Sequence, residues 1–154
     1  MKKILCLVLT ITLLFSLSIS SSANSNTVTS SVTSVEYFED GSYLETTIIT
    51  STPAVRSGVG GTKRLTYKNS DGDVEWIANL TGEFTYTGSS ATCTKSSITY
   101  SIENTKWKIP SATSSKSGNK AIGNVTAKYY VLGLNTKTVN EVITLTCSAT
   151  GVLS

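Results

Sequence analysis

The segment from Val74 to Tyr86 reads VEWIANLTGEFTY and decides the fold class. Apolar or small residues fill its even positions, and polar residues fill its odd positions, with Ile77 as the one exception. Successive side chains of a β-strand point to opposite faces of the sheet, so this alternation predicts a strand with one buried and one solvated face. Trp76 is expected in the core, and Glu75 is expected in solvent.

Two Asp-Gly pairs predict hairpins, because Asp-Gly readily adopts the positive φ angles of a two-residue turn. Asp71-Gly72 turns the 74–86 strand back on residues 62–69. With a two-residue loop, the pairs are Tyr67 with Trp76, Leu65 with Ala78 and Lys68 with Glu75. Asp40-Gly41 forms a second hairpin. Its pairs are Phe38 with Tyr43, Tyr37 with Leu44 and Glu36 with Glu45.

The rest of the chain also reads as strands and turns, and no segment has the 3.6-residue apolar period of a helix. Further strands are expected at 91–103, 107–109, 122–132 and 139–147, with loops at 56–62 and 111–119. The inward parity changes between Cys93 and Ile98, which predicts a β-bulge. We therefore predict an all-β protein, an antiparallel β-sandwich.

Cys93, Trp107 and Cys147 follow one another in the order of an immunoglobulin core, where a Trp packs on an inter-sheet disulfide. The general architecture is therefore expected to be immunoglobulin-like, although Leu145 stands where those domains place a tyrosine. We expect a disulfide between Cys93 and Cys147, either inter-strand or inter-sheet. The third cysteine, Cys6, lies in the signal peptide predicted below, so one pair remains, and an even pair in an exported chain is usually bonded. Closing this loop is worth roughly 4 kcal/mol in the chain-entropy model.

The first 23 residues indicate export. Lys2 and Lys3 precede an apolar run from Ile4 to Ile19, and small residues follow at 21–23. This is the layout of a secretory signal peptide, and the run is too short for a comfortable membrane span. We predict a signal peptide at 1–23, a flexible leader at 24–31 and one β-sandwich domain at 32–154. With no apolar C-terminal tail, the protein is expected to be secreted, with no stable membrane anchor after cleavage.

Composition removes several chemistries. Without Lys2 and Lys3 the chain has 11 basic and 10 acidic side chains, so no nucleic-acid partner is expected. It has no histidine, which excludes Ser-His-Asp and Cys-His catalysis, and we expect no metal and no cofactor. Asn69, Asp71, Asp73 and Glu75 imitate a calcium loop, but their spacing fits a turn better. Ser117-x-x-Lys120 lies in turn sequence rather than at a helix start.

Aromatic side chains are the remaining candidates for a binding surface. Tyr130, Tyr37, Tyr43 and Tyr100 are expected to face outward, whereas Trp76 and Trp107 are expected in the core. We predict no catalytic residue and a non-enzymatic extracellular module that binds a glycan or a protein partner. One alternative is a small secreted hydrolase that uses a pair of carboxylates. Another is a secreted antibacterial or membrane-active protein, although the chain has no basic amphipathic helix.

Three stretches resemble a group of small exported proteins of Gram-positive bacteria to which no activity is assigned. They are residues 37–45 (YFEDGSYLE), 90–94 (SATCT) and 145–151 (LTCSATG). The resemblance spans nearly all of the predicted mature chain. It implies export and a single β domain with one cysteine pair, and it supplies no catalytic residue.

Overall fold

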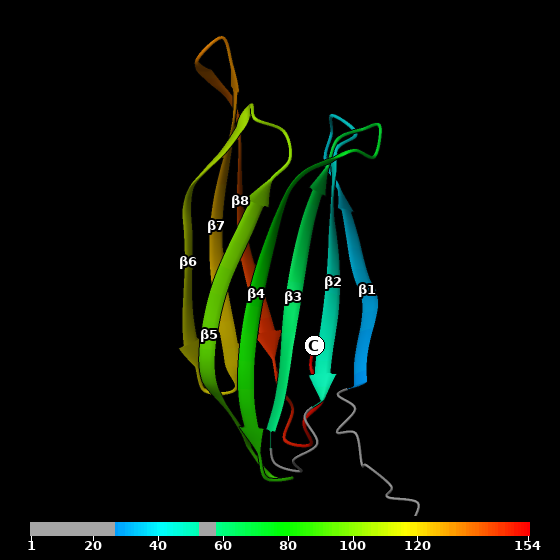
Figure 1. The fold of residues 1–154 in the computed structure, drawn as a ribbon, viewed down its shortest axis with the longest axis vertical. Helices are drawn as coiled ribbons and strands as arrows, with labels where there is room; N and C mark the ends of the chain where they lie inside the picture. Colours follow the sequence, from blue (N-terminus) through cyan, green and yellow to red (C-terminus); the bar gives the residue numbers. More distant parts are fainter. Residues whose placement is uncertain (1–26, 53–57) are drawn as a thin grey trace, which may run out of the picture.

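The computed structural model describes residues 27–52 and 58–154, which form eight β-strands (Figure 1). In chain order these are β1 (Thr27–Tyr37), β2 (Tyr43–Thr52), β3 (Gly58–Lys68), β4 (Val74–Tyr86), β5 (Ala91–Ile102), β6 (Trp107–Ser117), β7 (Lys120–Val131) and β8 (Leu134–Thr146). These residues contain no helix, and hence no helix long and apolar enough to cross a membrane. The all-β prediction is confirmed. The predicted signal peptide lies outside the described residues.

Two antiparallel sheets face each other (Figure 1). One has five strands in the order β1-β2-β3-β4-β5, and the other has three in the order β6-β7-β8. Neighbouring strands are always consecutive in sequence, so the chain changes sheet only between β5 and β6. Immunoglobulin domains instead use Greek-key connections. The immunoglobulin likeness is therefore wrong for the topology and holds only for the arrangement in two layers.

The core lies between the sheets and is closely packed at its centre. Both tryptophans are buried, as predicted, with Trp76 fully covered and Trp107 only 4% exposed. Small residues let the sheets approach each other. A Cβ atom at Gly123 of β7 would lie 3.0 Å from Ile98 and 3.2 Å from Leu80, both in the opposite sheet. The absence of a side chain at Gly123 thus leaves room for Ile98 and Leu80 of the opposite sheet.

The β3–β4 hairpin contains two irregularities that compensate each other. The Asn69 and Asp73 backbones bond across a three-residue loop, which shifts the register by one relative to a two-residue turn. Lys68 therefore pairs with Val74, and a bulge at Glu75 restores the predicted pairing of Tyr67 with Trp76. The prediction that Glu75 pairs with Lys68 in solvent is wrong, because the bulge turns its side chain inward and leaves it 7% exposed.

The β1–β2 hairpin also has a three-residue loop, Glu39-Asp40-Gly41, with Gly41 at a φ of 80°. Tyr37 therefore pairs with Tyr43, and Glu36 pairs with Leu44. The predicted register is wrong by one residue, which exchanges the faces of the β1 side chains relative to β2. Glu36 consequently lies on the same side as buried Leu44.

Several strands are longer than the sequence predicts. β1 already begins at Thr27, because residues 27–31 of the expected leader pair with β2. β3 includes three glycines of the expected loop, from Gly58 onward. β6 continues past Pro110 to Ser117, because the register shifts between Lys108 and Ser111, where an edge strand tolerates a residue without an N–H. The predicted bulge in β5 is confirmed: Phe84 pairs with Cys93, and Glu83 with Lys95.

The predicted disulfide is not formed: Cys93 and Cys147 are free and buried. Each thiol instead donates to a nearby carbonyl of its own segment, Cys93 to Lys95 at 3.3 Å and Cys147 to Ser148 at 3.4 Å. Both residues flank the β6–β7 turn, where the Cys93 N–H bonds to Gly118 and the Cys147 N–H bonds to Asn119. Trp107 begins β6 and so lies at the other end of the sandwich, which means that it does not pack on the cysteines.

Candidate functional site

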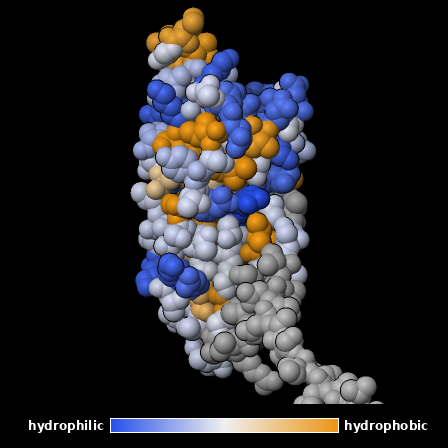
Figure 2. Space-filling view, in the orientation of Figure 1, coloured by the Kyte–Doolittle hydropathy of each residue, from blue (hydrophilic) through white to orange (hydrophobic). Residues whose placement is uncertain are grey.

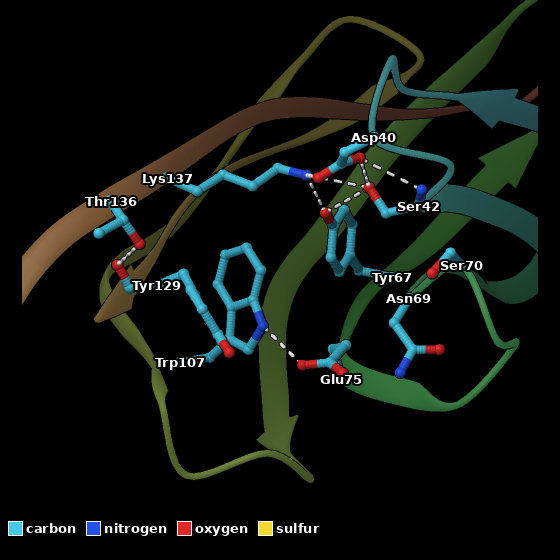
Figure 3. Close-up of a pocket in the computed structure, with 10 residues that line it drawn as sticks. All are labelled: Asp40, Ser42, Tyr67, Asn69, Ser70, Glu75, Trp107, Tyr129, Thr136 and Lys137. Atoms are coloured by element: carbon cyan, nitrogen blue, oxygen red, sulfur yellow. Dashed lines mark hydrogen bonds and ion pairs between the residues drawn. The ribbon is translucent and has the colours of Figure 1, made fainter. Parts of the chain in front are cut away.

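A pocket of about 350 Å³ opens at the end of the sandwich where Trp107 lies (Figure 3). We call it the end pocket. It is lined by Asp40, Ser42, Tyr67, Asn69, Ser70, Glu75, Trp107, Tyr129, Thr136 and Lys137. These residues come from the β1–β2 and β3–β4 hairpins of one sheet and from β6, β7 and β8 of the other. Both sheets therefore contribute to one cavity.

Lys137 of β8 crosses the pocket to the β1–β2 turn. Its Nζ donates to Asp40 Oδ2 at 2.6 Å, to Ser42 Oγ at 2.9 Å and to Tyr67 Oη at 2.5 Å. The Tyr67 hydroxyl in turn donates to Ser42, and Ser42 donates to Asp40. The ammonium also lies about 5 Å from the ring centres of Phe38 and Tyr67. All three ammonium protons are used, so this cation is committed to the protein itself.

Lys137 and Asp40 form an ion pair, and the interactions within it shift their two pKa values in opposite directions. The hydrogen bonds from Lys137 and then Ser42 lower the pKa of Asp40 from 3.8 to about 2. Burial opposes the charge on Lys137, but the bonds to Asp40 and Tyr67 outweigh it and raise its pKa. Both groups are therefore charged at neutral pH.

Glu75 is the second acidic residue that lines the end pocket, and it lies beside Trp107. Its Oε2 accepts from the Trp107 indole N–H and from the Asn104 side-chain amide, both at 2.7 Å. A buried carboxylate needs such donors, and the bulge in β4 is what places it within reach of them. Its second oxygen, Oε1, accepts no hydrogen bond from the described part of the chain.

Aromatic rings form the floor of the end pocket. The Tyr67 ring stacks on Trp76 with 5.4 Å between centroids and 4° between planes. Trp107 meets Tyr67 edge-on at 5.0 Å, and Tyr129 lies 5.3 Å from Trp107 (Figure 3). Among the described residues, no partner bonds to the hydroxyls of Tyr129 and Ser70. The cavity thus combines apolar faces with unused polar groups.

A second concavity of about 300 Å³, which we call the side groove, lies between β8 and the inner face of β1, β2 and β3. Glu36, Lys63 and Glu141 are its charged lining residues. Burial, and then the charge of Glu36, raises the pKa of Glu141. Burial lowers the pKa of Lys63, whose ammonium donates to the Thr144 carbonyl at 3.0 Å. Two carboxyls therefore share one groove.

The tyrosines chosen from the sequence do not form one surface. Tyr37 and Tyr43 lie together on the outer face of the five-stranded sheet, with ring centroids 5.4 Å apart. Tyr100 is 49% exposed on β5, and Tyr130 on β7 lies under the Lys108 ammonium. None of the four lines the end pocket.

Lys137, Asp40 and Glu75 were not predicted as residues of a site, and they belong to three different segments of the chain. No local pattern links them, since 97 residues separate Lys137 from Asp40. The alternating acids after Asn69 serve the turn instead of a calcium site: Asn69 Oδ1 accepts from the backbones of Asp71 and Asp73. The described residues contain no group of three or more acids and cysteines arranged to hold a metal.

No protein-family model matches the chain, and neither the curated proteins nor the solved structures include one similar to it.

Proposed function

We propose that this is an exported, non-enzymatic binding module that takes one sugar unit at the end of a glycan into the end pocket. A single observation carries the proposal: rings from both sheets form the floor of a cavity whose remaining polar groups are unpaired acceptors and hydroxyls. Sugars bind such sites through their apolar ring faces and their hydroxyls.

The charges favour a neutral ligand over an anion. The cation in the pocket, Lys137, is already bonded to three oxygens, and Asp40 is kept ionised beside it. Glu75 Oε1 and the Tyr129 hydroxyl can accept from sugar hydroxyls. The volume of about 350 Å³ is near the lower end of the range for ligand pockets, which fits one ring better than a long chain.

The test is titration of the protein with a panel of neutral and acidic sugars. Binding is detected by tryptophan fluorescence, because Trp107 lines the pocket. Thr136→Trp at the pocket mouth is expected to weaken binding at least about tenfold, equivalent to about 1.4 kcal/mol. Thr113→Trp, at an exposed position in the middle of β6, is the matched control and should bind normally. A blank panel, or equal binding by Thr136→Trp, would count against the proposal.

The side groove favours a second candidate, a small hydrolase. Glu141 has a raised pKa and faces the same groove as Glu36, and two carboxyls in unlike environments are what acid-assisted glycoside hydrolysis needs. Glu141 would then be the proton donor. Loss of a measured hydrolysis in both Glu141→Gln and Glu36→Gln, but not in Glu83→Gln, would establish this candidate, and the absence of any hydrolysis would remove it.

Export and the cysteine bond belong to the same proposal. Cys93 and Cys147 flank one turn, and the negative charge of a Cys93 thiolate raises the pKa of Cys147, second to burial. Outside the cell, thiol–disulfide exchange with a small disulfide would join them and release two thiols of the oxidant. Protein recovered from the culture medium should then be lighter than its reduced form by two hydrogen atoms. An unchanged mass would leave the cysteines free, as they are in the structure.

A further inference from the structure

The β7–β8 hairpin ends in an exposed apolar tip, Val131-Leu132-Gly133-Leu134. Leu132 is 98% exposed, Leu134 71% and Val131 41%. Figure 1 shows this hairpin projecting past the other turns at the same end of the sandwich, and Figure 2 shows its tip as a hydrophobic cap above more polar surface. Single exposed leucines are ordinary, but three adjacent apolar side chains at the end of a projection are not.

Local geometry does not explain the leucine. Leu132 has a φ of 49°, and it is the one non-glycine residue of the described chain with a positive φ. Asn, Asp and Gly adopt this conformation at lower cost than Leu. Leu132 also contributes nothing to the core, because almost all of its surface is in solvent. Its side chain is therefore placed for contact with something outside the protein.

The surface behind the tip is basic. Residues 104–140 contain six lysines and no acidic residue, and of these Lys106, Lys108 and Lys128 lie near the tip, whereas Lys116 and Lys120 lie at the opposite end of the sheet. Lys108 and Lys128 are paired across β6 and β7, and the Lys106 carbonyl accepts from the backbone of Tyr130, which directly precedes the tip. Apart from Glu103, the acidic side chains at this end belong to the β1–β2 and β3–β4 hairpins of the five-stranded sheet, and the β7–β8 hairpin projects beyond the turns of both (Figure 1).

We propose that the tip inserts reversibly into the interfacial layer of an anionic lipid bilayer, with Lys106, Lys108 and Lys128 against the headgroups and Tyr130 at the boundary. Apolar residues at the point, an aromatic ring behind them and lysines behind the ring match the layers of a bilayer surface. A protein partner fits less well, because three side chains cover far less than the roughly 800 Å² per side of a standard interface. This inference goes beyond sugar binding and does not depend on it.

The experiment measures co-sedimentation with vesicles of phosphatidylcholine alone or mixed equally with phosphatidylglycerol. All proteins carry the same N-terminus, so residues 1–26 contribute equally. The unaltered protein should prefer the anionic vesicles. Leu132→Asn with Leu134→Asn should weaken that binding by about tenfold or more, since Asn suits the turn and removes the apolar contact. Val152→Asn removes a 64% exposed valine at the opposite end and should bind normally.

Two further variants separate the contributions. Leu134→Trp should show a blue-shifted emission with anionic vesicles, which reports insertion even if the double variant folds poorly. Lys106→Gln, Lys108→Gln and Lys128→Gln together should abolish the anionic preference, whereas Lys116→Gln with Lys120→Gln, at the far end of the same sheet, should not. The proposal is overturned by absent vesicle binding, by equal binding of the Leu132/Leu134 double variant or by an unshifted Leu134→Trp emission. Self-association that the double variant abolishes would overturn it too, because the tip would then be a protein contact.

Discussion

The five-stranded and three-stranded sheets differ in charge as well as in size. Residues 27–103, which supply β1–β5, contain nine acidic and five basic side chains, whereas residues 104–154 contain six lysines and Glu141. The net charge of the whole chain, +3, hides this division. The two halves meet through an apolar core, and their polar contacts lie around it. Lys137 of one sheet bonds to Asp40 of the other, and Trp107 bonds to Glu75.

This difference bears on where the concavities lie. Both concavities are lined by residues of both sheets, and each lies beside a lysine that reaches from one sheet to the other. The end pocket lies where Lys137 crosses, and the side groove lies where Lys63 reaches Thr144. The two concavities thus lie at the seams between the sheets instead of on their outer faces.

The largest expected effect comes from removing the ring that joins the sheets at the end pocket. Trp107→Ala leaves a cavity beside Tyr67 and Tyr129 and deprives Glu75 of a donor, so it should cost about 3–5 kcal/mol of unfolding free energy. Urea denaturation measures this loss. Tyr100→Ala, at a half-exposed position, should change stability by about 0.5 kcal/mol or less. Similar losses of unfolding free energy in the two variants would show that Trp107 does not join the sheets.

A smaller loss of stability is expected where Gly123 packs against the opposite sheet. Gly123→Val adds a branched side chain opposite Leu80 and Ile98, and overpacking of this kind costs about 1–3 kcal/mol. Combining it with Ile98→Ala should cost less than the sum of the two single changes, because the alanine makes room. Strict additivity in urea denaturation would show that the two sites do not touch.

The bridge between Asp40 and Lys137 should appear in the acid limb of stability. The pKa of Asp40 is about 2 in the folded protein and 3.8 without its partners, so the carboxylate stabilises the fold above about pH 4 and loses this effect as the pH falls toward 2. The carboxylate is more than half exposed, so the contribution at neutral pH should stay below about 1 kcal/mol. Thermal unfolding of Asp40→Asn should lack this part of the pH dependence, and Asp71→Asn should retain it.

The smallest expected effect is a gain in stability instead of a loss, and it concerns Glu141 of the side groove. The pKa of Glu141 is raised in the fold, so its ionised form disfavours the folded state once the pH exceeds the unperturbed value of 4.5. Glu141→Gln should therefore melt a few degrees higher than the unaltered protein at pH 7, with the gain vanishing in acid. Glu83→Gln loses an exposed ion pair with Lys95 and should show no gain. A lower melting temperature for Glu141→Gln would contradict the burial argument.

Sequence reasoning succeeded where the signal was local. The alternation from Val74 to Tyr86 predicted β4 and the burial of Trp76. It failed at the β1–β2 loop, because an Asp-Gly pair is compatible with loops of two or three residues and the choice moves every later partner by one. That shift places Glu36 on the side of β1 that lines the side groove.

The end pocket could be predicted only in part. Burial of Trp107 followed from its pattern, but Glu75 was assigned to solvent because a bulge is invisible to a strict period of two. The basic character of β6–β8 is visible in the sequence, because residues 104–140 contain no acidic residue. The apolar sequence of the hairpin tip is visible as well. Their proximity to each other was not readable until the strands were placed.

By itself, the sequence determined the all-β class, most of the strands and the side chains that must leave water, because alternation and turn chemistry act over a few residues. Tertiary structure alone decided the division into five and three strands, the separation of the cysteine thiols and the meeting of Lys137 with Asp40. These depend on registers and on contacts between residues up to 97 positions apart, which are set by the packing of the whole chain.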